Sequence, residues 1–258
     1  MKIGLKILML VMLSLMICAC TDDGGGLSES GGSTLSGSYA NMLTVGEFLY
    51  VVSDDNLITY SITIPDQPTE LDRQELVFGI ESLFHRAGIL FVGSMTSMYI
   101  YQINELGIPE LKSETPYTNF ENITPCDPIV ANDTLAIASL SSVAVPTGGC
   151  GAALIDEIRF FDITDIEQPV QFNSVEMEQP KGLGLDDNIL FVCEAQNGLK
   201  IFDIQNALDV KLLYHFEGFK TFDIIATGSL ALVVGPDNLY EFDYSDIDDV
   251  KLLSNIEL

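Results

Sequence analysis

Few of the side chains that usually carry catalysis or metal binding occur in this chain, which has two histidines and five cysteines among 258 residues. His85 and His215 are far apart, and neither belongs to the H-x-H or H-E-x-x-H patterns in which imidazoles bind zinc. No nucleophile elbow, phosphate-binding loop or dinucleotide fingerprint occurs in the sequence. We therefore predict no catalytic residue and no metal site, and a protein that is not an enzyme.

The first two cysteines, Cys18 and Cys20, follow a short apolar run that begins after Lys2 and Lys6. A basic start and an uncharged run of this length are typical of a signal peptide, and the run is short for a membrane span. A metal or redox role for the pair would require further cysteine or histidine partners nearby, and the sequence has none there. Residues 1–19 are therefore predicted to be a signal peptide.

The residues "ICAC" at the end of this run resemble the lipobox of bacterial lipoproteins, in which an aliphatic and a small residue precede the modified cysteine. Ile17 and Ala19 occupy those positions before Cys20, whereas Cys18 would have Ile17 in the place of the small residue. The resemblance implies that Cys20 carries the lipid and becomes the first residue. Acyl chains on Cys20 would then hold the protein on a membrane.

Residues 20–38 are rich in glycine and serine and are predicted to form a flexible tether. Asp22 and Asp23, directly after the predicted lipid attachment site, resemble the export signals of surface lipoproteins in Bacteroidetes. We therefore expect the protein in a bacterial outer membrane. The choice between its periplasmic and its outer face stays open.

The chain is strongly acidic, with a formal net charge of −27 from 38 acidic and 11 basic residues. Such a surface repels the phosphates of nucleic acids and anionic lipid headgroups. Nucleic acid is therefore excluded as a partner. The acidity suits a cation or a basic partner, although solubility alone also explains it.

A unit of about forty residues recurs along the chain. Its most recognisable strand occurs five times, as LITYSI from Leu57, MYIYQI from Met98, IRFFDI from Ile158, LKIFDI from Leu199 and LYEFDY from Leu239. An apolar strand introduced by turn residues precedes each copy, and further strands open and close each unit. Because four short strands per unit are typical of a propeller blade, the sequence predicts an all-β fold, a five-bladed β-propeller preceded by the signal peptide and tether.

The propeller is expected over residues 39–258, with blades at about 39–78, 79–119, 120–177, 178–218 and 219–258. The unit FDITDIEQPVQF from Phe161 resembles the repeat of the LVIVD-repeat family of bacterial surface propellers. Asp162, Asp203 and Asp243 keep the acidic residue of that repeat, which other residues replace in the first two blades. The resemblance implies a propeller at the cell surface. It implies no particular chemistry, because the family has no common catalytic activity.

The third blade differs from the others by about twenty extra residues between its second and third strands. In an up-and-down blade this connection lies at the same end as the start of the first strand. Cys126, before the blade, and Cys150, in the insertion, are therefore expected on one face, and an exported protein keeps disulfides. We predict a Cys126–Cys150 disulfide, whereas Cys193 in its apolar strand is expected to be a buried structural thiol.

Short loops of the other blades place four carboxylates on the same face, namely Asp54, Asp55, Glu194 and Asp237. A rim of carboxylates suits Ca²⁺ or a basic partner. Aspartate is also common in tight turns that bind nothing. We therefore predict no cofactor and keep the rim as a candidate site for a cation or a partner.

Together these features favour a membrane-anchored lipoprotein whose propeller is a non-enzymatic binding or scaffolding module. Its expected ligand is an envelope protein or a glycan on the face that carries the insertion. Two alternatives stay open. One is a hydrolase or lyase that acts on a glycan or lactone at the propeller axis, and the other is a component of outer-membrane assembly.

Overall fold

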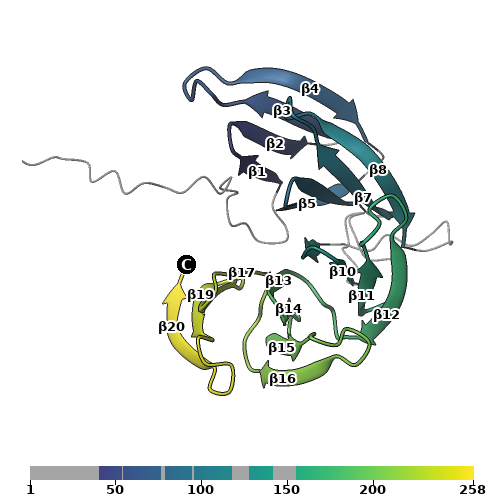
Figure 1. The fold of residues 1–258 in the computed structure, drawn as a ribbon. Coiled ribbons are helices and arrows are strands. Elements are labelled where there is room, and N and C mark those ends of the chain that lie inside the picture. Colours follow the sequence, from purple (N-terminus) through teal and green to yellow (C-terminus); the bar gives the residue numbers. More distant parts are fainter. Residues whose placement is uncertain (1–40, 54, 77–78, 95, 118–127, 142–154) are drawn as a thin grey trace, which may run out of the picture. The chain divides into compact units, whose positions relative to one another are not determined.

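All regular structure in the described residues is β-strand. The computed structural model describes residues 41–258 apart from 54, 77–78, 95, 118–127 and 142–154. The strands form five four-stranded antiparallel sheets, in which neighbours in the sheet are also neighbours in the sequence (Figure 1). Within this part of the chain, no helix has the length and apolar character needed to cross a membrane. The predicted all-β fold with five four-stranded units is confirmed.

The five sheets follow one another along the chain. The first contains β1 (Met42–Val45), β2 (Phe48–Ser53), β3 (Asn56–Ser61) and β4 (Thr69–Glu75). The second contains β5 (Ile80–Arg86), β6 (Ile89–Ser94), β7 (Ser97–Ile103) and β8 (Pro109–Pro116). The third contains β9 (Ile129–Ala131), β10 (Leu135–Leu140), β11 (Glu157–Asp162) and β12 (Val170–Glu176). The fourth contains β13 (Leu183–Asp186), β14 (Ile189–Cys193), β15 (Leu199–Asp203) and β16 (Lys211–Phe216), and the fifth β17 (Asp223–Ala226), β18 (Leu230–Val234), β19 (Asn238–Asp243) and β20 (Lys251–Glu257).

A tight turn joins the first two strands of each sheet, at the turn residues that the sequence indicates. Gly46, Gly88 and Gly228 have φ angles of 56°, 79° and 79°, in the left-handed region that glycine enters without steric cost. Asp187 takes the same conformation in the fourth sheet, with a φ of 48°. In the third sheet the side-chain oxygen of Asn132 accepts two backbone N–H groups of the turn instead.

The fourth strand of every sheet contains a β-bulge at the same place in the repeat. The pairing of the third and fourth strands shifts register there by one residue. The extra residues are Leu71, Lys112, Phe172, Leu213 and Leu253. Because a bulge bends and twists a strand, these outermost strands (Figure 1) are poor templates for pairing with another chain.

Among the described residues the hydrophobic core consists of four clusters, each between two consecutive sheets. A sheet packs one face on the sheet before it and the other on the sheet after it, and we call these its first and its second face. Between the first two sheets, for example, Tyr50 packs with Leu90 and Tyr101. The innermost strands β1, β5, β9, β13 and β17 contact one another in that order (Figure 1). Sheets packed in this way are the blades of a β-propeller.

The acidic residue of the repeat ends the third strand of the last three sheets. Oδ1 of Asp162 accepts hydrogen bonds from the backbone N–H and the hydroxyl of Thr164, at 2.9 and 2.7 Å. Asp243 accepts the same pair from Ser245, at 2.9 and 2.6 Å, and Asp203 accepts the N–H two residues further on at 2.8 Å. These hydrogen bonds hold the pKa of the Asp162 and Asp243 carboxyls below their ordinary value. The repeated aspartate is therefore a turn residue.

Candidate functional site

An open pocket of about 350 Å³ lies where the third and fourth sheets meet, at the end of the sheets that carries the insertion. Three segments line it: the start of β11, the connection from β12 to β13, and the turn from β14 to β15. The lining residues are Asp156, Met177, Glu178, Gln179, Gln196 and Asn197. All but one of these side chains end in a carboxylate or an amide, so the wall offers both hydrogen-bond donors and acceptors.

The turn that supplies Gln196 and Asn197 is tightly constrained by its own backbone. The N–H of Glu194 donates to the carbonyl of Gly198 at 2.8 Å, and the N–H of Asn197 donates back to the carbonyl of Glu194 at 2.5 Å. Gly198 has a φ of 83°, and a Cβ atom at this position would lie 2.0 Å from the carbonyl oxygen of Phe216. No other residue fits there, so the glycine fixes the course of the turn.

Two residues beside the pocket have an unusual backbone conformation. Gln179 lines the pocket with a φ of 56°, and Ala195 precedes Gln196 with a φ of 32°. A positive φ costs energy for a residue with a Cβ atom and persists only where the surroundings impose it. The other two such residues in the described chain, Ala87 and Asp187, lie in the tight turns between first and second strands.

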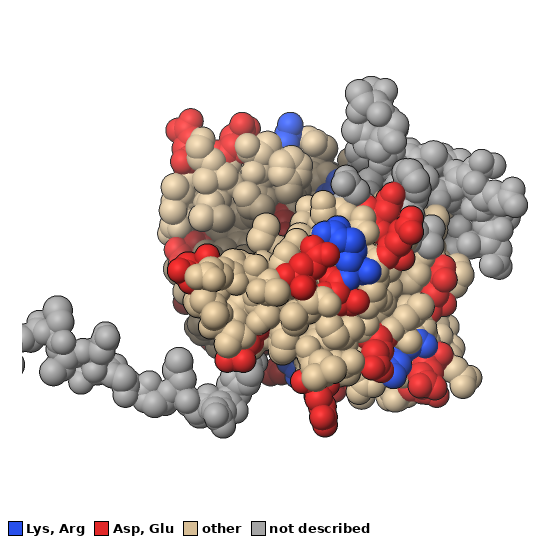
Figure 2. Space-filling view, turned by 90° about the horizontal axis from the view of Figure 1, so that it is seen from above, with Lys and Arg blue, Asp and Glu red and all other residues tan. Residues whose placement is uncertain are grey.

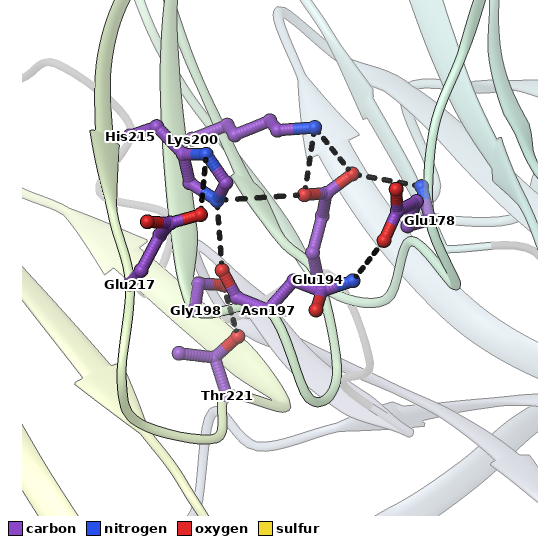
Figure 3. Close-up of polar contacts among 8 residues, drawn as sticks. All are labelled: Glu178, Glu194, Asn197, Gly198, Lys200, His215, Glu217 and Thr221. Atoms are coloured by element: carbon purple, nitrogen blue, oxygen red, sulfur yellow. Dashed lines mark hydrogen bonds and ion pairs between the residues drawn. The ribbon is translucent and has the colours of Figure 1, made fainter.

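The carboxylate of Glu194 is fully buried beneath the turn and is held by three neighbours (Figure 3). Its Oε1 accepts the backbone N–H of Glu178 and the ammonium of Lys200, each at 2.9 Å. Its Oε2 lies 2.8 Å from Nζ of Lys200 and 3.9 Å from Nε2 of His215. Because a buried charge is stable only when it is paired, Lys200 is essential to this arrangement.

The same cluster continues to the pocket wall through Asn197 (Figure 3). Its side-chain amide donates to Oε2 of Glu178 at 2.7 Å, and its backbone carbonyl lies 2.8 Å from Nε2 of His215. A carbonyl only accepts hydrogen bonds, so Nε2 of His215 carries the proton in this contact. Thr221 donates to the carbonyl of Gly198 at 2.6 Å and ties the turn to the fifth sheet. The pocket wall thus rests on a rigid polar base.

The electrostatic character of this region is negative. Glu178 and Asp156 are two of the lining residues. Acidic side chains also outnumber basic ones on the different face of the molecule that Figure 2 shows. In the described part of the chain, no three His, Cys, Asp or Glu residues come together in a group that could hold a metal ion. The arrangement is therefore suited to hydrogen bonding with a polar ligand that has hydroxyl or amino groups.

The carboxylates that the sequence assigns to a rim differ in their surroundings. Asp55 is half-buried in the turn between β2 and β3, and Asp237 is exposed between β18 and β19. Glu194 lies in the equivalent turn of the fourth sheet, but it is buried and paired with Lys200. Asp54 lies outside the described residues, as do Cys18 and Cys20 near the N-terminus, Cys126 before the third sheet and Cys150 in the insertion.

The remaining cysteine and the two histidines have structural surroundings. Cys193 is fully buried with a free thiol, as expected, and burial raises the pKa of that thiol far above its ordinary value. The Nε2 atom of His85 accepts the backbone N–H of Gly88 at 3.0 Å, and burial lowers the pKa of this imidazole. His215, by contrast, belongs to the cluster around Glu194.

Sequence reasoning did not identify Lys200, Asn197 or the pocket itself. One signal for Lys200 is visible in the repeat. At its position the other third strands have Ile58, Tyr99, Arg159 and Tyr240. A basic residue in an apolar strand requires an acidic partner nearby, and Arg159 indeed pairs with the partly buried Glu157 at 2.6 Å. The pocket has no such signal, because its wall comes from three separate segments.

No family model matches the sequence, and neither does any curated protein. Among solved structures, a functionally unknown protein from Desulfotomaculum acetoxidans is 15% identical, with a TM-score of 0.64 over 86% of this chain and 68% of that one. The periplasmic gluconolactonase PpgL of Pseudomonas aeruginosa is 14% identical, with a TM-score of 0.59 over 83% and 68%. Apo AztD from Citrobacter koseri is 14% identical, with a TM-score of 0.57 over 80% and 58%. At such identities the matches show the fold alone, which is that of a propeller protein.

Proposed function

We propose that this protein is a lipid-anchored, five-bladed propeller of the LVIVD-repeat type, and that it is a non-enzymatic binding or scaffolding module of the bacterial cell envelope. The predicted signal peptide, the lipobox ending at Cys20 and the tether support the location. The repeated units over residues 39–258 support the class of propeller. Its ligand is an envelope protein or a glycan, bound at the end of the sheets that carries the insertion.

The observation that carries this proposal is the polar pocket between the third and fourth sheets. Its lining combines amides and carboxylates, which are the side chains that bind sugar hydroxyls and the polar groups of a protein loop. The base of the pocket is held by a buried ion pair and by a glycine that no other residue can replace. Binding to a preformed wall avoids the entropic cost of ordering it.

The test is a binding screen of the purified protein against a glycan array and against solubilised envelope proteins. Gln196 is exposed and Glu178 lies beside it, so Gln196→Ala and Glu178→Ala leave the core intact. We expect each variant to weaken capture of the ligand about tenfold, the effect of one lost hydrogen bond to a charged or polar group. Asp209→Ala, exposed in the connection from β15 to β16 at the opposite end of the fourth sheet, is the matched control and should leave binding unchanged.

Two results would contradict the proposal. One is equal binding by all three variants, which would remove the pocket as the site. The other is turnover of a lactone or glycan by the purified protein, because the matched gluconolactonase has this fold. Turnover would favour the alternative of an enzyme.

A further inference from the structure

The pocket between the third and fourth sheets fits one of the two proposed ligand classes better than the other. Among the described residues that line it, only Met177 is apolar, whereas Asp156 and Glu178 end in carboxylates. Binding to another protein depends mainly on aromatic and arginine side chains in desolvated pockets, and carboxylates are depleted at the centre of such interfaces. A glycan instead offers many hydroxyl groups, each of which donates and accepts hydrogen bonds. The lining therefore favours a glycan over an envelope protein.

The size of the pocket indicates a short bound segment. Its volume of about 350 Å³ lies at the lower end of the range for small-molecule sites, which is roughly 300–1,000 Å³. A stable protein–protein contact, by contrast, buries about 800 Å² on each partner. Because the pocket is open, the end of a glycan can enter it while the rest of the glycan stays in solvent.

Two of the lining side chains lie next to each other as a hydrogen-bonded pair (Figure 3). The side-chain amide of Asn197 donates to Oε2 of Glu178 at 2.7 Å. This bond leaves Oε1 of Glu178 as an acceptor, and it leaves Asn197 with a second N–H and with Oδ1. Two neighbouring hydroxyls of a sugar ring can bind such a pair, since one donates to the carboxylate while the other accepts from the amide.

The backbone behind this pair is fixed by hydrogen bonds between the lining segments and their surroundings. The N–H of Met177 donates to the carbonyl of Asp156, and the N–H of Glu178 donates to Oε1 of Glu194, both at 2.9 Å. A wall that is already ordered binds a ligand without the entropic cost of ordering it. The polar groups of the wall are therefore presented to a ligand in fixed positions.

The charge of the lining selects among glycans. None of the described residues that line the pocket is basic, so the lining supplies no positive charge for an acidic group. The ammonium of Lys200 lies 2.8 Å from Oε2 of Glu194, and this buried pair has no net charge. A carboxylate, sulfate or phosphate on the ligand would meet the carboxylate of Glu178, and like charges brought together oppose binding.

Resting on the proposed function, we infer that the pocket binds the end of a glycan without acidic groups, and that Glu178 is the side chain that excludes acidic sugars. Uncharged sugars bind through the pair of Glu178 and Asn197. Amino sugars bind at least as well, because an ammonium group forms a charge-assisted hydrogen bond with the same carboxylate.

A glycan array probed with the purified protein tests this inference. The array carries oligosaccharides of glucose, galactose and mannose, and beside each one the counterpart that ends in the matching uronic acid. We expect binding to uncharged oligosaccharides, and binding to their acidic counterparts that is weaker by at least about tenfold at low salt. The difference should shrink in about 1 M NaCl, because the Debye length falls from about 10 Å at 0.1 M to about 3 Å.

Glu178→Gln separates the charge of this residue from its hydrogen bond with Asn197. The glutamine oxygen still accepts from the amide, so binding of uncharged oligosaccharides should change by less than about threefold. The preference over acidic counterparts should fall by at least about fivefold, because the repelling charge is gone. Asp209→Asn removes a charge at the opposite end of the fourth sheet, and as the matched control it should change neither value.

Three results would overturn the inference: tighter binding of the acidic oligosaccharides, an unchanged preference in Glu178→Gln, or an array without any bound glycan. If an envelope protein is captured instead, and Gln196→Ala weakens its capture, the inference is wrong while the proposed function holds. If neither a glycan nor a protein depends on the pocket, both are wrong.

Discussion

At the scale of single residues, the candidate site depends on one buried carboxylate. Removing two charges from water costs several kcal/mol each. Glu194 is stable in its position because its Oε1 accepts hydrogen bonds from Lys200 and the N–H of Glu178, and its Oε2 forms an ion pair with Lys200 at 2.8 Å. The ion pair also explains how a short turn with an exposed tip can have a defined shape. The side chain of Glu194 is anchored beneath the turn, while the side chain of Gln196 is exposed and can contact a ligand.

Removing Lys200 should therefore be costly. We expect Lys200→Met to lower the free energy of unfolding by about 3 kcal/mol, because it leaves a buried carboxylate without its partner. The double variant Lys200→Met with Glu194→Gln should recover most of this loss, since the amide oxygen still accepts the N–H of Glu178. Urea unfolding measures both values. Equal losses in the single and the double variant would show that the cost does not come from the unpaired charge.

At the scale of elements, each repeat contains local turns and a bulge that end one strand or shape the next. Three features recur: the aspartate at the end of the third strand, the residue with a positive φ after the first strand, and the bulge in the fourth strand. They recur because each depends only on residues that are close to it in the sequence. In the first sheet Ser61 occupies the position of the aspartate, and its Oγ accepts the N–H of Thr63 at 3.5 Å. The acidic group itself is thus dispensable for the turn.

The turn at Asp243 allows a test of this interpretation. Asp243→Ala should lower the melting temperature by about 2 °C, whereas Asp243→Asn should lower it less, because its side-chain oxygen still accepts from Ser245. The folded-state pKa of Asp243 is lowered by those hydrogen bonds, so its contribution to stability is present above the unfolded pKa and is lost as the pH falls through the folded value. Thermal unfolding at several pH values measures this. An Asn variant with the same acid sensitivity as the parent would contradict the assignment.

At the scale of the whole molecule, the proposed location depends on the N-terminal cysteines, which lie outside the residues that the structure describes. The proposed anchor rests on the sequence of residues 1–38 alone.

The anchor predicts different behaviour for two neighbouring cysteines. Cys20→Ser should release the protein from the membrane fraction or block its processing, because the lipid has no other attachment site. Cys18→Ser should have little effect, since Cys18 is removed with the signal peptide. Fractionation of expressing cells with detection of the protein by immunoblot measures both. Two variants that are both cleaved and both membrane-bound would refute the lipobox.

Much of the architecture follows from the sequence alone. The strand order, the turn residues and the position of the insertion were all expected, because alternating apolar residues and turn chemistry act over short distances. The burial of Cys193 also follows from its place in an apolar strand. The sequence likewise excludes the familiar catalytic motifs, which are local patterns.

Only the tertiary structure decided how residues from different segments combine. It placed Glu194 under a turn, paired it with Lys200, and brought Asp156, Glu178 and Asn197 to one pocket. It also distinguished the end sheets from the inner ones, although their residues are alike in sequence. The physical reason is that burial and charge pairing depend on what lies across a junction between sheets, and a repeat of forty residues does not encode which of its copies has a neighbour.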